Sequence, residues 1–559
     1  MTRGRRGSRS RPGGRAEARR APRPGAWGAG LGPDLAVGGA VIAVAVAAAA
    51  RRTRLGTWLA RSPWRQWTRS TWFPGLAVAL PALVLLAVVL GAAARRRQQV
   101  SRVRGASGDG PAGQGWATRR ELASLRCRAP TGDRIVLGAA GPRGSLLAAE
   151  PRQSVLVVGP SQSGKTTALA VPAILEWDGP VLATSVKTDL LHATRGQRAS
   201  SGEIAVFDPT GVTGDRSCAW SPLAEATSWG GARRVAHSLC SVGRSPAGIE
   251  DAAFWYGAAE RLLAPLLRAA ALASGSMGDV LRWLDEETAN EPLLVLDVAG
   301  EREAARVAMS CFSLEERQRS SVYSTARSVL DAYADPAVLA SEHGARRVTP
   351  DWLLAGEGGA PGGVRTLYCC APARDQDRLA PVFVALVRSV LDAAFASAAR
   401  NGRPLDPPLL VVLDEAANVA PLDDLDQVLS TAAGHGISLV TVWQDLAQIE
   451  ARYDERWATI VNNHRAKAIC PGVADPRTLE LVSSLIGDVE APQLSTSRGG
   501  EGSWSETESR WRVPVAPAGW IRRMPSRHVL VVYGGLPPAL AKMRQVSSRP
   551  DGIVSVERR

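Results

Sequence analysis

The chain has 559 residues, of which 45% are hydrophobic and 21% charged, so it is long enough for two or three folded domains. Its formal net charge of +14 suggests a nucleic-acid-binding protein, but residues 1–120 alone hold 22 arginines against three acids. The remaining residues carry 45 basic and 50 acidic side chains, a net charge of −5, which excludes a body that is basic throughout.

An arginine-rich segment, residues 1–34, opens the chain. Its nine arginines are scattered among Gly, Ala and Pro, a composition that cannot bury a core, so we expect a disordered tail on the cytoplasmic side of a membrane. A DNA-binding role for this tail is the alternative interpretation.

Two apolar segments within residues 35–94 predict a transmembrane region. Residues 74–94 are 21 residues without a charge, enough at 1.5 Å per residue to span a hydrocarbon core of ~30 Å. Residues 35–50 form a weaker span of 16 residues, for which a buried core helix is the alternative. Five of the 17 tryptophans lie at or between the segments, and nine arginines precede them, six separate them and seven follow within residues 95–120. We expect a multi-pass protein of the inner (cytoplasmic) membrane with both termini in the cytoplasm.

After a linker at residues 95–129, strand-length apolar runs occur in two groups. They lie at residues 134–137, 154–158, 181–184 and 204–207, and again at 364–370, 409–413, 437–443, 466–470 and 528–533. Between residues 223 and 345 we find helical patterns instead, such as 252–273 and 314–333. The order predicts an α/β fold with a mostly parallel sheet from residues 130–222 and 360–545, an all-α insertion domain at 223–359, and a tail at 546–559. Residues 495–512, rich in Ser, Gly and Glu, predict a flexible or late-ordering loop.

The first strand group contains a phosphate-binding motif. Gly-Pro-Ser-Gln-Ser-Gly-Lys-Thr at residues 159–166 fits the P-loop pattern G-x-x-x-x-G-K-[ST] and directly follows an apolar strand run. Glycines let backbone N–H groups wrap the phosphates, the lysine reaches the β- and γ-phosphates, and the hydroxyl binds Mg²⁺. The predicted ATP site therefore comprises Gly159, Pro160, Ser161, Gln162, Ser163, Gly164, Lys165, Thr166 and Thr167. The lysine is one of only four in the chain: Lys165, Lys187, Lys467 and Lys542.

The second half of the predicted site follows the run at residues 409–413, where Asp414 and Glu415 have the Walker B form. Asp414 and Thr166 would hold Mg²⁺, and Glu415 would deprotonate the attacking water. Taken alone, an Asp-Glu pair at the end of a strand marks an ordinary surface turn as often as it marks a Walker B site. Gln444, after the run at 437–443, is a candidate γ-phosphate sensor, although a Gln at a strand end is otherwise an ordinary solvated residue. We predict Lys165, Glu415 and Gln444 as catalytic residues, with ATP and Mg²⁺ as cofactors. We expect no structural metal, because the six histidines and seven cysteines lack ligand spacing.

Several segments together resemble the type IV secretion coupling proteins, the TraG/TraD-type conjugative DNA transfer ATPases, over residues 130–545. Besides the P-loop they are residues 184–190, 207–210, 220–223, 413–418, 442–448, 459–464 and 534–538. The resemblance implies a RecA-like P-loop NTPase domain with an all-α domain that receives the substrate, two N-terminal transmembrane helices, and a homo-hexameric ring. It also implies ATP-driven passage of single-stranded DNA with its relaxase, or of protein effectors, toward components of a type IV secretion channel.

Two questions stay open at this point. Many relatives carry an arginine in the turn before the sensor strand, where it reaches a neighbouring subunit's nucleotide, but residues 432–436 of this chain contain none. Arg452, Arg456 and Arg465 are the remaining candidates. The function also has rivals: a receptor ATPase for protein cargo of a secretion system, and an FtsK- or HerA-like DNA translocase. Lys187 fits either a place in the nucleotide pocket or an exposed position after a strand.

Overall fold

The computed structural model describes residues 115–140, 144–244, 252–344, 346–355, 363–498, 504–548 and 554–556. The chain divides into two compact units, Met1–Arg102 and Val103–Arg559, and all described residues belong to the second. The predicted tail and transmembrane region, residues 1–94, lie outside the described residues. Within the described part, one helical stretch, Ala373–Asn401, is long and apolar enough to cross a membrane, and 72% of its most apolar window is buried inside the fold.

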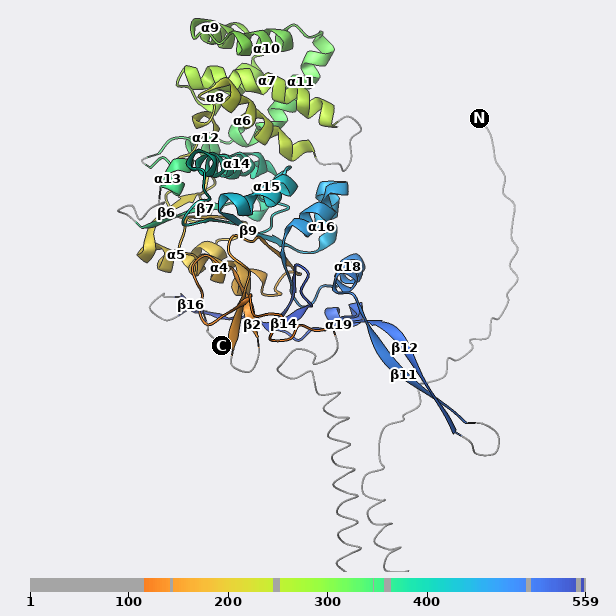
Figure 1. Ribbon diagram of the computed structural model, residues 1–559. Helices are drawn as coiled ribbons and strands as arrows, with labels where there is room; N and C mark the ends of the chain where they lie inside the picture. Colours follow the sequence, from red (N-terminus) through yellow and green to blue (C-terminus); the bar gives the residue numbers. More distant parts are fainter. Residues whose placement is uncertain are drawn as a thin grey trace, which may run out of the picture. The chain divides into compact units, whose positions relative to one another are not determined.

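Twelve of the described strands form one mixed sheet at the centre of the fold (Figure 1). Their order is β1 (Arg126–Cys127), β3 (Ser145–Ala148), β2 (Val136–Ala140), β14 (Ala539–Lys542), β13 (His528–Tyr533), β10 (Ala466–Ile469), β4 (Val155–Val158), β9 (Ile437–Trp443), β8 (Leu409–Leu413), β5 (Val181–Ser185), β7 (Val364–Cys370) and β6 (Gly202–Phe207). The strands from β10 to β6 pair parallel, and those from β1 to β10 pair antiparallel. The predicted α/β fold is confirmed, but the expectation of a mostly parallel sheet is wrong for the strands from β1 to β10.

The parallel strands are apolar runs because they are covered on both faces. In β8, Leu409, Val411 and Leu413 pack into one core while Leu410 and Val412 pack into the other. Successive side chains of a strand point to opposite faces, so a strand buried on both sides has no polar alternation. The antiparallel strands β1, β3 and β14 have only two to four residues and give no comparable signal in the sequence.

Helices supply the cover on each face. On one side lie α4 (Val171–Leu175), which continues the short π-helix η2 (Thr166–Ala170), and α5 (Asp189–Ser201). The other side holds α14 (Gln376–Asn401), α15 (Leu425–Ala432), α16 (Leu446–Tyr453), α17 (Trp457–Asn463), α18 (Pro476–Ile486) and α19 (Ala518–Arg522).

Between β6 and β7 the chain forms a helical insertion. Its helices are α6 (Trp229–Ser241), α7 (Ala252–Leu272), α8 (Met277–Asp285), α9 (Asn290–Val298), α10 (Arg302–Phe312), α11 (Glu316–Val329), α12 (Pro336–Ala340) and α13 (Pro350–Leu354). The long helix α7 packs against α6, α9, α10 and α11. Figure 1 shows α9 and α10 farthest from the sheet, with α14 and α15 between the insertion and the sheet.

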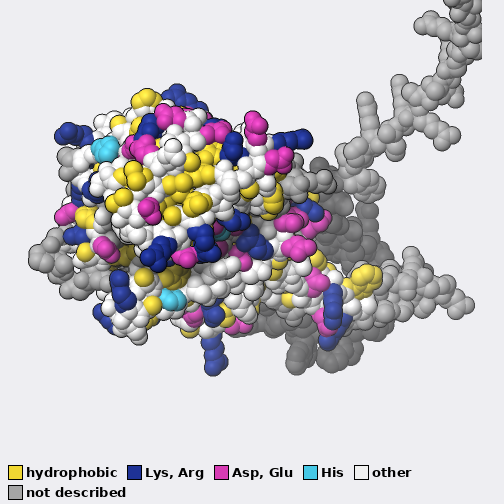
Figure 2. All heavy atoms as spheres, turned by 90° about the horizontal axis from the view of Figure 1, so that it is seen from above, with side chains coloured by type: hydrophobic (Ala, Val, Ile, Leu, Met, Phe, Trp, Pro, Cys, Tyr) yellow, Lys and Arg dark blue, Asp and Glu magenta, His cyan; other side chains and the backbone are white. Residues whose placement is uncertain are grey.

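The far face of the insertion exposes apolar side chains. Leu294 and Val298 of α9 and Met309 of α10 are 64%, 80% and 60% exposed. Figure 2 views the molecule from this side and shows apolar side chains gathered among charged ones.

The predicted loop at residues 495–512 is wrong for residues 495–498 and 504–512, which are strands, while residues 499–503 lie outside the described residues. Strands β11 (Asp488–Arg498) and β12 (Trp504–Pro514) pair in antiparallel register as a hairpin that extends away from the sheet (Figure 1). Near its base Val489 faces Val513 and Ala491 faces Trp511. These apolar cross-strand pairs stabilise the register. The Ser- and Glu-rich composition of residues 495–512 gave no sign of them in the sequence.

Candidate nucleotide-binding site

The P-loop follows β4, which lies between β10 and β9, and its first glycine is fixed by its neighbours. Gly159 N donates to the Trp443 carbonyl at 3.1 Å. A Cβ atom on Gly159 would lie 2.6 Å from Cys470 Cβ and 2.7 Å from Ser163 Oγ, so no larger residue fits. Gly164 has φ +92°, a left-handed conformation that favours glycine. The two glycines therefore allow the tight turn that a phosphate-wrapping backbone requires.

Lys165 and Thr166 turn into the site at the start of the helix that follows. The Lys165 ammonium donates to the Gly159 carbonyl at 2.7 Å, and only 9% of the residue is exposed. Burial lowers its pKa, while the charge of Asp414 opposes this effect. A buried cation held by one carbonyl is prepared to pair with an anionic phosphate.

Asp414 meets the P-loop although 248 residues separate it from Thr166. The Thr166 hydroxyl lies 3.3 Å and 3.2 Å from the two Asp414 carboxylate oxygens, and Asp414 N donates to Thr184 O at 3.2 Å. Burial raises the pKa of Asp414 to about 6, the Glu415 charge adds to the shift, and the Thr166 hydrogen bond and the Lys165 charge oppose it. A buried carboxyl beside a hydroxyl is an all-oxygen donor set of the kind Mg²⁺ prefers, so these two residues fit the predicted ion.

Glu415 follows directly, in an unusual backbone conformation. Its φ is +58°, a region that residues other than glycine rarely occupy. Its side chain is half-buried, and the Asn418 amide donates to Glu415 Oε2 at 3.4 Å. Strain of this kind concentrates at functional sites, where the surrounding structure holds a side chain in a required direction. Asn418 was not among the predicted site residues, although it lies within the segment 413–418.

Gln444 and Lys187 lie at the same edge of the sheet. Gln444 is exposed and follows Trp443, which pairs with Val158 at the end of β4, and its backbone N–H donates to Gln448 Oε1 at 3.1 Å. Lys187 is exposed after β5, and its charge lowers the pKa of Asp414. The structure thus brings the predicted residues to the carboxyl ends of neighbouring parallel strands, where open α/β sheets bind ligands.

The three candidate arginines are all engaged within the chain. Arg452 donates to the Val242 and Pro421 carbonyls at 3.0 and 3.3 Å. Arg456 pairs with Asp423 at 2.9 Å and with Asp426 at 3.2 Å, and Arg465 pairs with Glu150 at 3.2 Å and lies over the Tyr533 ring. Of the two ion-paired arginines, Arg465 is the more exposed, with 52% of its side chain accessible against 42% for Arg456.

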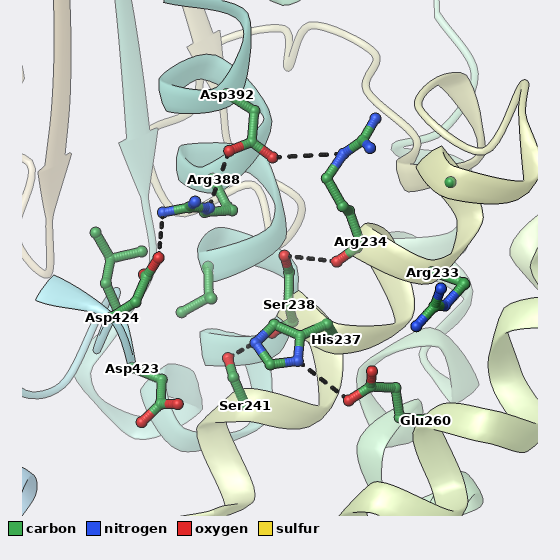
Figure 3. A pocket seen from close by; sticks show the side chains of 13 residues that line it. Arg233, Arg234, His237, Ser238, Ser241, Glu260, Arg388, Asp392, Asp423 and Asp424 are labelled. Carbon is green, nitrogen blue, oxygen red and sulfur yellow. Dashed lines mark hydrogen bonds and ion pairs between the residues drawn. The ribbon is translucent and has the colours of Figure 1, made fainter. Parts of the chain in front are cut away.

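A pocket of about 470 Å³ joins the helical insertion to the segment that follows Glu415 (Figure 3). Arg388 of α14 pairs with Asp392 at 3.1 Å and with Asp424, just before α15, at 2.6 Å. Arg234 of α6 approaches Asp392 at 3.8 Å, and His237 of α6 contacts Glu260 of α7 at 3.1 Å. Through Asp392 and Arg388 these ion pairs connect α6 of the insertion to α14 and to the segment before α15.

Comparison with known proteins adds a family match. A family model described as type IV secretory system conjugative DNA transfer matches residues 119–546. The chain is 26% identical over 367 residues to the conjugal transfer protein TraG of Escherichia coli, covering 60% of this chain and 55% of that protein. It is 23% identical over 426 residues to the protein VirD4 of Agrobacterium fabrum, covering 73% and 61%. The chain thus spans little more than half the length of these curated relatives.

Solved structures agree in fold. The bacterial conjugative coupling protein TrwBdeltaN70 superimposes with a TM-score of 0.57 at 20% identity, covering 76% of this chain and 91% of that one. The plasmid coupling protein TrwB in complex with ADP and Mg²⁺ gives the same score and identity over 78% and 95%. At this identity the likeness establishes a shared fold.

Proposed function

Because the chain belongs to the type IV secretory system conjugative DNA transfer family, we propose that it is a membrane-anchored ATPase. It couples ATP hydrolysis to the recruitment of a relaxase–DNA complex and to its translocation into a type IV secretion channel. The relatives named above, conjugal transfer and coupling proteins, support this choice of cargo.

The observation that carries the enzymatic part is the meeting of Thr166 and Asp414 at 3.2 Å, with Lys165 buried beside them. Three side chains from two distant segments meet there and place one ammonium group next to a hydroxyl and a carboxylate. A structural turn that binds nothing has no need to bury a lysine and an aspartate together, since each loses its hydration there.

The residues divide the work of phosphoryl transfer among them. The P-loop backbone and Lys165 bind the β- and γ-phosphates, and Thr166 and Asp414 would hold Mg²⁺, which neutralises charge on the phosphate oxygens. Glu415, oriented by Asn418, accepts a proton from the water that attacks the γ-phosphorus. Gln444 stands at the neighbouring strand end, where it senses the γ-phosphate.

The assembly belongs to the same proposal. We infer a homo-hexamer in the inner membrane, anchored through residues 35–94 with both termini in the cytoplasm, with single-stranded DNA and its relaxase and secretion channel components as partners. A receptor for protein cargo is the second candidate. The net charge of −5 beyond residue 120 favours it, because such a body does not attract a polyanion through its overall field.

The test combines biochemistry and transfer. Purified full-length protein should release phosphate from ATP in the presence of Mg²⁺. A donor strain lacking the gene should lose plasmid transfer and regain it with the wild-type gene. Phosphate release without any effect on plasmid transfer would move the assignment to protein cargo, and absence of phosphate release would remove the ATPase assignment.

A further inference from the structure

A chain of buried side chains anchors the end of β9, the strand that precedes Gln444. Its members Thr441, Trp443 and His464 are all fully buried. The Thr441 hydroxyl lies 2.9 Å from His464 Nε2, and the Trp443 indole Nε1 donates to Thr441 Oγ1 at 3.0 Å. His464 Nδ1 lies 2.8 Å from the carbonyl oxygen of Ile460 in α17. These contacts connect the end of β9 to α17.

The direction of each hydrogen bond in this chain follows from the chemistry of its groups. A carbonyl oxygen only accepts, so Nδ1 of His464 carries a proton and donates it to Ile460. Burial lowers the pKa of His464 to about 4, so near neutral pH the ring holds one proton and Nε2 is an acceptor. The Thr441 hydroxyl therefore donates to Nε2, and its oxygen accepts from the Trp443 indole. Because each group has one defined role, the chain fixes the side chains that it joins.

The backbone at the end of β9 in turn holds both halves of the nucleotide site. The Trp443 carbonyl accepts from the N–H of Gly159 in the P-loop at 3.1 Å. The Val442 carbonyl accepts from the N–H of Ala416 at 3.2 Å, and Ala416 directly follows Glu415. A shift of this strand end would therefore reach the P-loop on one side and the Walker B segment on the other.

The two halves depend on β9 to different degrees. The P-loop strand is also supported by the residue after β10, whose N–H donates to the Val158 carbonyl at 2.8 Å. Glu415 lies between two anchored neighbours, since Asp414 N is bound to Thr184 of β5 and Ala416 N to β9. The Glu415 φ of +58° is a conformation that persists only where the surrounding structure holds it. Loss of the β9 anchor should therefore disturb Glu415 more than the phosphate-binding backbone.

We propose that His464 is a positioning residue for ATP hydrolysis, which through Thr441 and Trp443 holds the strand end that keeps Glu415 in place. The inference rests on the proposed ATPase function and adds to it a fully buried residue that acts only through others. Neither His464 nor Thr441 was among the predicted site residues.

The experiment separates turnover from nucleotide binding in the full-length protein in detergent. Thr441→Val is nearly isosteric and removes the hydroxyl, and His464→Asn keeps a donor near the position of Nδ1 but removes the acceptor at Nε2. Both variants should lower kcat for phosphate release by about 10- to 100-fold, the scale of a small misplacement of a catalytic group, and keep the dissociation constant for ADP with Mg²⁺ within about threefold of wild type. His464→Gln brings an amide oxygen near the position of Nε2 and should restore most of the turnover.

Ser438→Ala is the matched control on the same strand. Ser438 is 1% exposed, and its hydroxyl has no hydrogen-bond partner within the part of the chain that the structure describes. Its removal should leave kcat unchanged. A thermal unfolding curve for every variant shows whether the protein is folded at the assay temperature.

Wild-type kcat in Thr441→Val and His464→Asn, with or without a loss of stability, would make the chain purely structural and overturn the inference. The same holds if His464→Gln turns over no faster than His464→Asn, if ADP affinity falls as far as kcat, or if neither Thr441→Val nor His464→Asn folds. Wild-type protein that releases no phosphate would instead overturn the ATPase function itself.

Discussion

Lys165 places its ammonium inside the P-loop and contributes nothing to the apolar clusters. Lys165→Ala removes the cation that binds phosphate, so we expect ATP hydrolysis to be abolished while the fold is retained. Phosphate release and a thermal unfolding curve on one preparation test this. Lys542→Ala, an exposed lysine of β14, is the control. A Lys165→Ala protein that keeps most of the wild-type rate would refute the P-loop assignment.

Glu415→Gln separates binding from chemistry. Glutamine keeps the shape and loses the base, so nucleotide affinity should stay near wild type while turnover falls by about 10²–10⁴-fold. Affinity and steady-state turnover measured side by side distinguish the two effects, with the exposed Glu455→Gln as the matched variant. Loss of binding itself would show that Glu415 is structural.

His464 makes stability depend on pH. It is fully buried, shares a hydrogen bond of 2.9 Å with the Thr441 hydroxyl, and lies 2.8 Å from the Ile460 carbonyl. Burial lowers the pKa of His464 to about 4. The hydrogen bond to the Ile460 carbonyl opposes this shift, and the smaller effect of the Lys467 charge adds to it. The unfolded chain takes up a proton below about pH 6.5, whereas the folded chain does so only near pH 4.

The contribution of His464 is therefore complete above pH 6.5 and is lost as the pH falls from there to about 4, by on the order of 3 kcal/mol. Chemical denaturation at pH 7.5, 6 and 5 measures it. His464→Gln should flatten this part of the pH dependence, and the exposed His192→Gln should not. Equal pH profiles for the two variants would contradict the prediction.

At the scale of elements, Arg388 joins α14 to the loop before α15 and compensates two carboxylates, Asp392 and Asp424. Burial also raises the pKa of Asp392. Arg388→Met keeps the aliphatic stem but leaves Asp424 without this cation and Asp392 with only the more distant Arg234, so we expect a loss of about 1–3 kcal/mol in the free energy of unfolding. Urea denaturation checks this. Arg374→Met is the control, because the Arg374 side chain is 86% exposed and its loss should leave the free energy of unfolding unchanged. An equal loss of stability in both variants would contradict the prediction.

The elements also show what a sequence can predict. Strands buried on both faces, such as Leu409–Leu413, appear in the sequence as apolar runs, and the P-loop is one contiguous motif. Both could therefore be predicted from the sequence. The short strands β1 and β14 have too few residues for a pattern. The ion pair of Arg388 with Asp424 carries no local signature either, because the topology creates it.

At the scale of the whole molecule, the charge is divided between an arginine-rich N-terminal region and a body of net charge −5. If the body moves DNA, its contacts come from basic groups that a ring brings together. Deleting residues 1–25, which hold all nine arginines of the tail, should then leave DNA binding that is weak for the monomer, strengthens on oligomerisation and weakens with salt. Fluorescence anisotropy of labelled single-stranded DNA, titrated with salt, compares the full-length and shortened proteins in detergent. Binding that disappears with the deletion would assign the DNA contacts to the tail.

The strand order has a consequence for biosynthesis. Strand β4, which carries the P-loop, lies between β10 and β9, and both of these follow it in the chain by about 280 residues or more. At translation rates of about 5–20 residues per second, the ribosome needs tens of seconds to supply the first neighbour of β4. During that time an apolar strand with two unpaired edges awaits its partners, the condition that favours aggregation of nascent chains. A product that ends before residue 437 therefore lacks both neighbours of β4 and cannot build the surroundings of the P-loop.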